Sequence, residues 1–265
     1  LSAEKSQNFK KNKNHISDLL NNAGIKWHFI EYTKKPPVLS TIKDIRHFNK
    51  KAAELHQKYN FDICHCRSYI SAFAGLRLKN KFNLPFLFDM RGFYADERID
   101  GGLWNTKNPV FKLVYKFFKR KEKHFFESSD HIISLTETGK EVICDFEHIK
   151  TNETDITVIP CCADLRHFDP GKSDKSLKNK LKNETGIKDN DFVISYLGSL
   201  GTWYMTDEML DFYAELLKEK PNAKFLIISR DNPEIILKPA KEKNIPLDNI
   251  IIRPADRDEV PEMIS

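Results

Sequence analysis

The sequence predicts an α/β protein with two Rossmann-like, parallel-sheet domains, the second of them incomplete. Short apolar segments with strand-like spacing alternate with longer segments whose apolar residues recur at helical spacing. Strands that alternate with helices need crossover connections, and such connections produce parallel, doubly wound sheets. The alternation restarts after a polar stretch that begins at Gly171. We therefore expect an N-terminal domain over residues 1–170 and a C-terminal domain over residues 171–265.

The first half is expected to open in the tail of a strand at residues 1–3. Residues 84–89 are interpreted as a buried strand, because the strands of a parallel sheet are apolar on both faces. Gly24 is expected to end the first helix, and Ser40 or Thr41 to cap the second. The other predicted strands are 26–32, 61–67, 131–135 and 156–159, and the predicted helices are 8–23, 39–59, 69–82, 109–127 and 137–148.

The second half repeats the pattern with fewer strands. Its predicted strands are 192–197, 224–229 and 250–253, and its predicted helices are 175–185, 207–220 and 234–244, with a last helix starting at Asp258. Three strands are fewer than the about 5–6 of an average sheet. Because both ends also fall within elements, we expect the chain to be an internal fragment of a longer two-domain protein.

Composition narrows the class of protein. The chain has 265 residues, a net charge of +5, a mean hydropathy of −0.53 and no apolar run near the ~18–20 residues that span a bilayer. Its five cysteines cannot all pair, and none has Cys-x-x-Cys spacing. Cys64 and Cys66 alternate in a predicted strand and should share one side of it. A metal site there would lack further ligands, so we expect free thiols in a reducing cytosol and no metal.

The most informative stretch is residues 86–98, where an apolar run turns into a dense charged segment. Asp89 and Arg91 come just past the predicted strand, and ligands bind at the carboxyl ends of strands in open α/β sheets. The residues after them are expected to form a loop that Gly101 and Gly102 make mobile. The charged residues of this predicted loop are Asp96, Glu97 and Arg98.

A basic segment follows over residues 109–127. Its apolar residues follow helical spacing, whereas Lys112, Lys116, Lys119 and Lys123 fall on another face. Two interpretations stay open: a surface helix packed on a sheet, or a helix that leans on an anionic membrane surface. No aromatic and basic platform accompanies the helix, so nucleic acid is not an expected partner.

Several segments together resemble family-4 glycosyltransferases of the GT-B fold. Residues 158–164 followed by Phe168–Pro170 resemble the segment that leads between the two domains of that family. Residues 192–201 are similar to the strand and glycine turn that open its donor domain. The segments 224–229, 249–253 and 258–261 match the strands and short helix that follow. The resemblance covers nearly the whole chain, and its order and spacing are more specific than any single motif.

The resemblance implies transfer of a sugar from a nucleotide-diphosphate donor to an acceptor hydroxyl, with retention of configuration and usually no essential metal. No cofactor is implied, since the nucleotide sugar is a substrate. The donor would lie mostly on the C-terminal domain and the acceptor on the N-terminal one. Donor-binding candidates are Gly198, Ser199, Gly201, Thr202, Arg230 and Arg253. The two glycines permit close approach of the backbone to a phosphate, although an ordinary strand-to-helix turn has the same appearance.

The chain departs from the family in two respects. The family usually places an Arg directly after the first glycine and a Lys in the following helix, whereas this chain has Ser199 and Trp203–Thr206 there. Cations would then come from Arg91, Arg230 or Arg253, or donor binding differs. The family's pair of glutamates would lie beyond Ser265 and its glycine-rich loop before Leu1. A chain that ended there would be expected to have weak or no transferase activity.

In the first domain the resemblance points to Asp89 and Arg91 as catalytic. Asp89 would hydrogen-bond a sugar hydroxyl or the acceptor and Arg91 would face the diphosphate, although an Asp–Arg pair that only braces the loop fits equally well. Arg67 and Ser68 lie at the same predicted sheet edge. They are candidates for the acceptor side, together with Asp96, Glu97 and Arg98, while Ser68 as a helix cap is the alternative. His65, His131 and His167 have no acid–base partner evident in the sequence.

The expected product is a cell-surface polysaccharide or lipid-linked glycan, made in the cytoplasm or peripherally at the inner face of a membrane. Two alternatives stay open: a sugar-nucleotide epimerase of the same fold, and a domain pair that holds a nucleotide or glycan without turnover. No nucleophile elbow, P-loop or zinc-type spacing occurs in the sequence.

Overall fold

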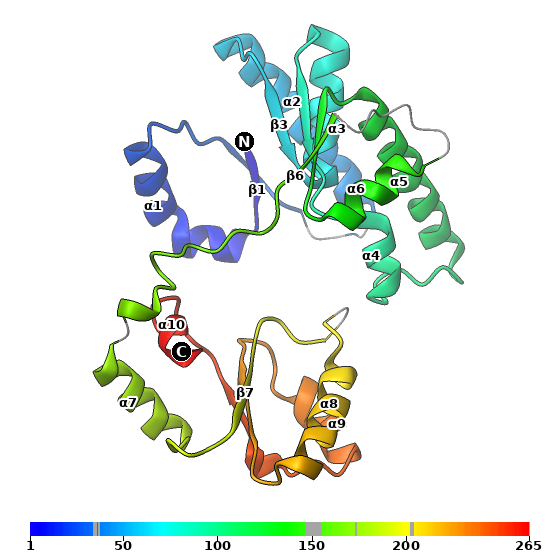
Figure 1. Ribbon diagram of the computed structural model, residues 1–265. Coiled ribbons are helices and arrows are strands. Elements are labelled where there is room, and N and C mark those ends of the chain that lie inside the picture. Colours follow the sequence, from blue (N-terminus) through cyan, green and yellow to red (C-terminus); the bar gives the residue numbers. More distant parts are fainter. Residues whose placement is uncertain (34–35, 37, 147–154, 173, 202–203, 265) are drawn as a thin grey trace. The chain divides into compact units, whose positions relative to one another are not determined.

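A computed structural model describes all residues except 34–35, 37, 147–154, 173, 202–203 and 265 (Figure 1). The chain divides into two compact units, of which the first contains Leu1–Ile99 and Trp104–Cys161 and the second Asp100–Leu103 and Cys162–Ser265. Each unit carries helices and an all-parallel sheet, which confirms the predicted fold class. The functional division at residue 170 stays a prediction.

The first unit contains two parallel sheets. Strands β1 (Ser2–Glu4) and β2 (Phe29–Glu31) form a two-stranded sheet. The four-stranded sheet has the order β3-β4-β5-β6, with β3 at Cys64–Arg67, β4 at Phe86–Asp89, β5 at His131–Ser134 and β6 at Ile156–Val158. Its helices are α1 (Ser6–Asn22), α2 (Leu39–Tyr59), α3 (Ser68–Phe82), α4 (Tyr94–Asp100), α5 (Pro109–Ser128) and α6 (Glu137–Cys144).

The outer edges of β1 and β3 carry no paired strand among the described residues. A cavity of about 860 Å³ is lined by both strands, with Ser2 and Ala3 from β1 and Cys64–Arg67 from β3. Within the described residues, both edges therefore border this cavity.

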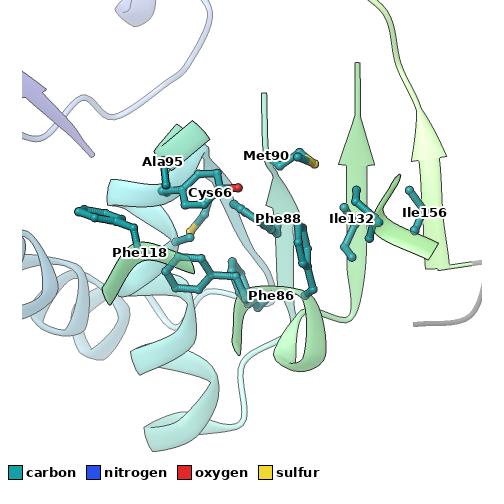
Figure 2. Packing of buried hydrophobic residues seen from close by; sticks show 13 residues of the cluster. Cys66, Phe86, Phe88, Met90, Ala95, Phe118, Ile132 and Ile156 are labelled. Carbon is teal, nitrogen blue, oxygen red and sulfur yellow. The ribbon is translucent and has the colours of Figure 1, made fainter. Parts of the chain in front are cut away.

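The core of the first unit lies on one face of the four-stranded sheet. Phe86 and Phe88 of β4 and Ile132 of β5 are almost fully buried and point to the same side (Figure 2). Helices α3 and α5 cover this face, and Phe125 of α5 stacks against Phe88 with ring centroids 5.4 Å apart. Cys66 points into this core with Cys64 beside it, and their sulfurs are 3.3 Å apart, as alternation along one strand predicts.

The second unit is a three-stranded sheet in the order β7-β8-β9, with β7 at Val193–Leu197, β8 at Lys224–Ile228 and β9 at Ile250–Arg253. Its α-helices are α7 (Lys175–Thr185), α8 (Thr206–Glu219), α9 (Glu234–Glu242) and α10 (Val260–Met263), and two short 3-10 helices occupy Pro170–Lys172 and Leu247–Asn249. Tyr213 of α8 anchors the core, because its buried hydroxyl donates to the carbonyl of Ala223 at 2.7 Å.

Two local predictions were wrong. Residues Tyr94–Asp100 form helix α4 rather than a loop. Its acidic first turn and the arginine near its end suit the helix dipole, and the buried Ala95 fixes it to the core. Neither Ser40 nor Thr41 caps α2, whose N-cap is Val38 without a side-chain hydrogen bond, and Ser40 is buried within the helix.

Helix α6 ends at Cys144, and the predicted end at His148 lies outside the described residues.

Asp130 ties the start of β4 to α3. Its carboxylate accepts a hydrogen bond from the Phe86 amide at 2.7 Å and pairs with Lys79 at 2.5 Å. Burial opposes the charge, but the bonds from Lys79 and Phe86 outweigh it and hold the pKa of Asp130 below its usual value.

We expect Asp130→Asn to lower the free energy of unfolding by about 1 kcal/mol at pH 7, since a charge-assisted bond at a half-exposed site is lost. A lowered pKa adds stability above the unfolded value of 3.8 and loses it as the pH falls through the folded value. In urea unfolding, the difference in unfolding free energy between the parent and Asp130→Asn should therefore become smaller as the pH falls toward the folded pKa of Asp130. Asp62→Asn, an exposed site on the same unit, is the matched control. A deficit that is constant with pH would contradict the prediction.

Candidate functional site

The carboxyl ends of β3 and β4 place charged side chains together. Asp89, the last residue of β4, lies opposite Arg67, the last residue of β3, in the parallel register. His65 precedes Arg67 by two positions and so lies on the same face of the strand. This is the sheet edge at which ligands bind in open α/β sheets.

Asp89 is the centre of this group, which we call the Asp89 site: His65, Arg67, Asp89 and Arg91. The residue is only 7% exposed. Its Oδ2 lies 3.6 Å from His65 Nε2 and its Oδ1 lies 3.9 Å from Arg91 Nη1. Oδ1 is buried and accepts no hydrogen bond from any described residue. Because buried polar atoms are nearly always paired, this oxygen is suited to accept a hydrogen bond from a bound ligand.

The backbone around the site is strained. Ser68 and Arg91, which follow the ends of β3 and β4, have φ angles of 68° and 64°, in the left-handed region that L-residues rarely adopt. Gly92 has φ 150°, and a Cβ there would lie 2.0 Å from Glu97 Oε1. Strain of this kind gathers at functional sites. The Arg91 guanidinium lies 3.7 Å from Cys161 Sγ.

His65 is the functional candidate that the sequence did not reveal. Its acid partner Asp89 lies 24 positions later in the sequence (89 − 65), and the parallel register of β3 and β4 brings the two side chains together. The one feature of the sequence that could have pointed to His65 is its position, two residues before the end of the strand that pairs with β4.

The predicted acceptor-side residues separate into two groups. Arg67 is exposed at the site, and Ser68 begins α3 without capping it. Asp96, Glu97 and Arg98 lie instead on α4. The Arg98 guanidinium stacks 4.1 Å from the Tyr94 ring centroid, and Asp96 is held by hydrogen bonds within the unit.

Asp96 belongs to an ionic network that joins α3, α4 and α5. Its carboxylate accepts hydrogen bonds from Tyr115 and Lys119, both at 2.8 Å. Lys119 also pairs with Glu122, and the Tyr69 hydroxyl donates to the same glutamate. Burial raises the pKa of Glu122 although both partners favour its charged form. Lys119, predicted to lie on the basic face of residues 109–127, is thus half-buried and forms ion pairs with Asp96 and Glu122.

The glycine turn of the second unit uses most of its amides internally. Gly198 donates to the Ile228 carbonyl at 3.2 Å, Leu200 to Asp231 at 2.8 Å and Gly201 to Thr206 at 3.0 Å. The Ser199 carbonyl accepts from Tyr196 at 2.7 Å. Gly201 has φ 77°, a left-handed conformation that favours glycine. Thr202, also predicted to bind the donor, lies outside the described residues.

The two arginines predicted on the donor side are both paired. The exposed Arg230 donates to Asp256 at 2.7 Å and to the Ala255 carbonyl at 3.0 Å. Arg253 lies between Glu184 at 2.7 Å and Glu259 at 3.0 Å. No three His, Cys, Asp or Glu side chains of the described residues come together as metal ligands.

Known proteins resemble this chain in sequence and in fold. The family description "Glycosyltransferase Family 4" matches residues 18–167. The chain is 20% identical over 205 residues to a D-inositol 3-phosphate glycosyltransferase of Segniliparus rotundus, which covers 76% of this chain and 42% of that protein. The chain therefore spans less than half the length of that relative.

Solved structures share the fold. One is WaaG, a glycosyltransferase involved in lipopolysaccharide biosynthesis, with a TM-score of 0.61, 13% identity and coverage of 100% of this chain and 72% of that one. Another is Anabaena Alr3699/HepE in complex with UDP and glucose, with a TM-score of 0.59, 12% identity and coverage of 94% and 61%. Since the family match extends over more than half of the residues, this chain belongs to Glycosyltransferase Family 4 and has the GT-B fold.

Proposed function

We propose that the protein transfers a sugar from a nucleotide-diphosphate sugar to an acceptor hydroxyl, with retention of anomeric configuration. The observation that carries this proposal is the buried Oδ1 of Asp89, which accepts no hydrogen bond from the described residues, at the carboxyl end of β4 in a family-4 chain. The structural relative HepE, which holds UDP and glucose, supports a nucleotide sugar as the donor class.

In this mechanism Asp89 accepts a hydrogen bond from a hydroxyl of the transferred sugar or of the acceptor. Negative charge develops on the leaving diphosphate as the glycosidic bond breaks, so a cation placed there lowers the barrier. Arg91 is the best candidate, because its guanidinium is partly exposed and its nearest carboxylate oxygen lies 3.9 Å away. The competing role for Asp89 and Arg91 is to brace the loop. The two roles differ because a substitution at Arg91 would lower mainly turnover in the first case, and turnover and stability together in the second.

On the donor side we propose that the turn at Gly198–Gly201 approaches the diphosphate. The Ser199 amide has no internal hydrogen bond among those recorded for the described part of the turn, which supports this role. Arg230 is the better of the two arginines, since it is exposed and held by a single carboxylate. Arg253 would first have to leave two glutamates.

The acceptor is proposed to be a glycan or a lipid-linked molecule, held by the first unit near Arg67 and Ser68. Peripheral contact with the cytoplasmic face of a membrane through residues 109–127 belongs to the same proposal. Support comes from α5, where Leu113 and Phe117 are exposed beside the exposed Lys112 and Lys116. None of the described helices is both long and apolar enough to cross a bilayer.

Isothermal titration with uridine, guanosine and adenosine diphosphate sugars, followed by a transfer assay, tests the proposal. We expect one nucleotide class to bind and its sugar to appear on an added acceptor with the anomeric configuration retained. Binding without transfer would instead indicate a binding module. Isomerised or released nucleotide sugar in the absence of acceptor would indicate an epimerase, and no binding of any nucleotide would overturn the proposal.

A further inference from the structure

An apolar groove of about 690 Å³ lies in the first unit between the start of α2, helix α4 and helix α5. We call it the α2–α5 groove. Its walls are largely aliphatic and aromatic, and the rings of Tyr94, Trp104 and Phe118 pack against one another in T-shaped and tilted arrangements, with centroids 5.0–6.0 Å apart. The volume is in the range of sites that bury a small ligand.

Both charged residues that line the groove are arginines. Arg46 is exposed on α2, and its side chain forms no ion pair or hydrogen bond with the described part of the chain. Arg98 stacks over Tyr94 and Trp104, at 4.1 and 5.7 Å from the ring centroids. Its Nε is buried and has no hydrogen-bond partner among the described residues. With no carboxylate among the lining residues, the groove suits a molecule with an apolar body and an anionic end.

The apolar surface continues outward from the groove. On α5, Val114 and Phe118 line the wall together with Leu113 and Phe117, which are 68% and 46% exposed and so carry the lining out to the surface. Ile42 of α2 is 42% exposed on the facing side. Lys112 and Lys116 flank the exposed stripe. A helix with an exposed apolar stripe beside lysines is typical of proteins that lie in the interface of an anionic bilayer.

We propose that the α2–α5 groove binds the hydrocarbon chain of one anionic membrane lipid. The chain lies against Trp104, Val114 and Phe118, and the lipid phosphate lies at Arg46 and Arg98. Continuity of the groove wall with the exposed stripe of α5 favours a lipid over a soluble ligand, because a chain can enter directly from the bilayer. The proposal goes beyond sugar transfer and does not require it.

Fluorescence of Trp104 tests the groove directly. A variant with Trp27→Phe and Trp203→Phe keeps Trp104 as the single tryptophan. Equimolar phosphatidylglycerol and phosphatidylcholine vesicles with brominated chains should quench it strongly, since bromine quenches only at close range. The matched control keeps Trp27, which packs between Phe9 and Phe29 in the two-stranded part of the unit, and should be quenched far less.

A charge-reversal variant of Arg46 tests whether this residue binds the lipid headgroup. Arg46→Glu should weaken cosedimentation with these vesicles about tenfold or more. Arg77→Glu, the same charge change on the exposed side of α3, should have a much smaller effect. Vesicles of phosphatidylcholine alone should bind both forms weakly.

The outcomes separate this proposal from the proposed function. Vesicle binding without quenching of Trp104 would overturn the groove site while leaving peripheral membrane contact intact. Equal quenching of Trp27 and Trp104 would overturn it as well. Tight binding of an amphipathic helical peptide, with no quenching by brominated lipid, would assign the groove to a protein partner. Titration with nucleotide sugars in the absence of lipid is independent of all these results.

Discussion

Lys119→Met should lower the free energy of unfolding by about 3–5 kcal/mol, the size expected when one partner of a buried ion pair is removed. Lys119 is the cation shared by Asp96 and Glu122, and Glu122 is only 2% exposed. Without Lys119, the hydroxyl of Tyr69 is the one partner left for the buried charge of Glu122 among the residues that the structure describes. Urea unfolding followed by circular dichroism measures the effect.

The pH dependence of this deficit has a definite sign. Burial already raises the pKa of Glu122, and loss of Lys119 would raise it further. A carboxyl group with a raised folded pKa loses stability as the pH rises from its unfolded value through its folded value. The deficit of Lys119→Met should therefore be largest at neutral pH and shrink as the pH falls toward 4.5, the unfolded value.

Two further variants control the experiment. Lys123→Met removes a lysine of the same helix that faces only Glu127 at 3.6 Å, and should cost less than about 0.5 kcal/mol. Adding Glu122→Gln to Lys119→Met removes the stranded charge and should restore part of the lost stability. Equal losses for Lys119→Met and Lys123→Met would show that the network contributes little to the fold.

Arg91→Ala should lower turnover by about 10²–10³-fold while changing the unfolding free energy little. The magnitude is that of removing one group that stabilises developing negative charge in a transition state. Little structural cost is expected, because the nearest carboxylate oxygen is 3.9 Å away and the side chain is partly exposed. The measurement is transfer kinetics on the intact enzyme, paired with urea unfolding of the same preparation.

Arg91→Lys separates charge from geometry, since lysine keeps the charge but loses the planar fork of donors. Turnover intermediate between the parent and Arg91→Ala would fit a role on the diphosphate. Arg77→Ala on α3 serves as the surface control. A parallel fall of turnover and stability in Arg91→Ala would instead assign the residue to bracing of the loop with Asp89.

The sequence predicted which residues lie at the edge of the sheet better than it predicted the contacts between residues of neighbouring strands. An apolar run that ends in Asp89 places that residue at the end of a strand without any knowledge of the fold. Its neighbour His65 depends on the register between β3 and β4, which no local pattern encodes. In the second unit, the spacing of Gly198 and Gly201 predicted a turn, but not that Asp231 and Thr206 already bind its amides.

Lys119 and helix α4 also show that local sequence patterns do not predict contacts between separate elements. Helical periodicity assigns Lys119 to the polar face of α5, and that assignment is correct for an isolated helix. Its partner Asp96 lies on another helix, so its burial follows from packing rather than from spacing. Helix α4 has only seven residues, fewer than the 11–18 residues over which periodicity is informative, so its run of charged residues predicts a loop instead.

The unpaired edges of β1 and β3 have a consequence for cooperativity. A two-stranded ladder is marginally stable by itself, and among the described residues β1–β2 shares no backbone hydrogen bonds with the four-stranded sheet. In this 265-residue chain we expect β1–β2, which is held to α2 through the buried Ile30, to fray at a lower free energy than the aromatic core behind β4. Asp89 and Arg91 belong to the slower-opening part, so the polar cluster can outlast partial unfolding of its own unit.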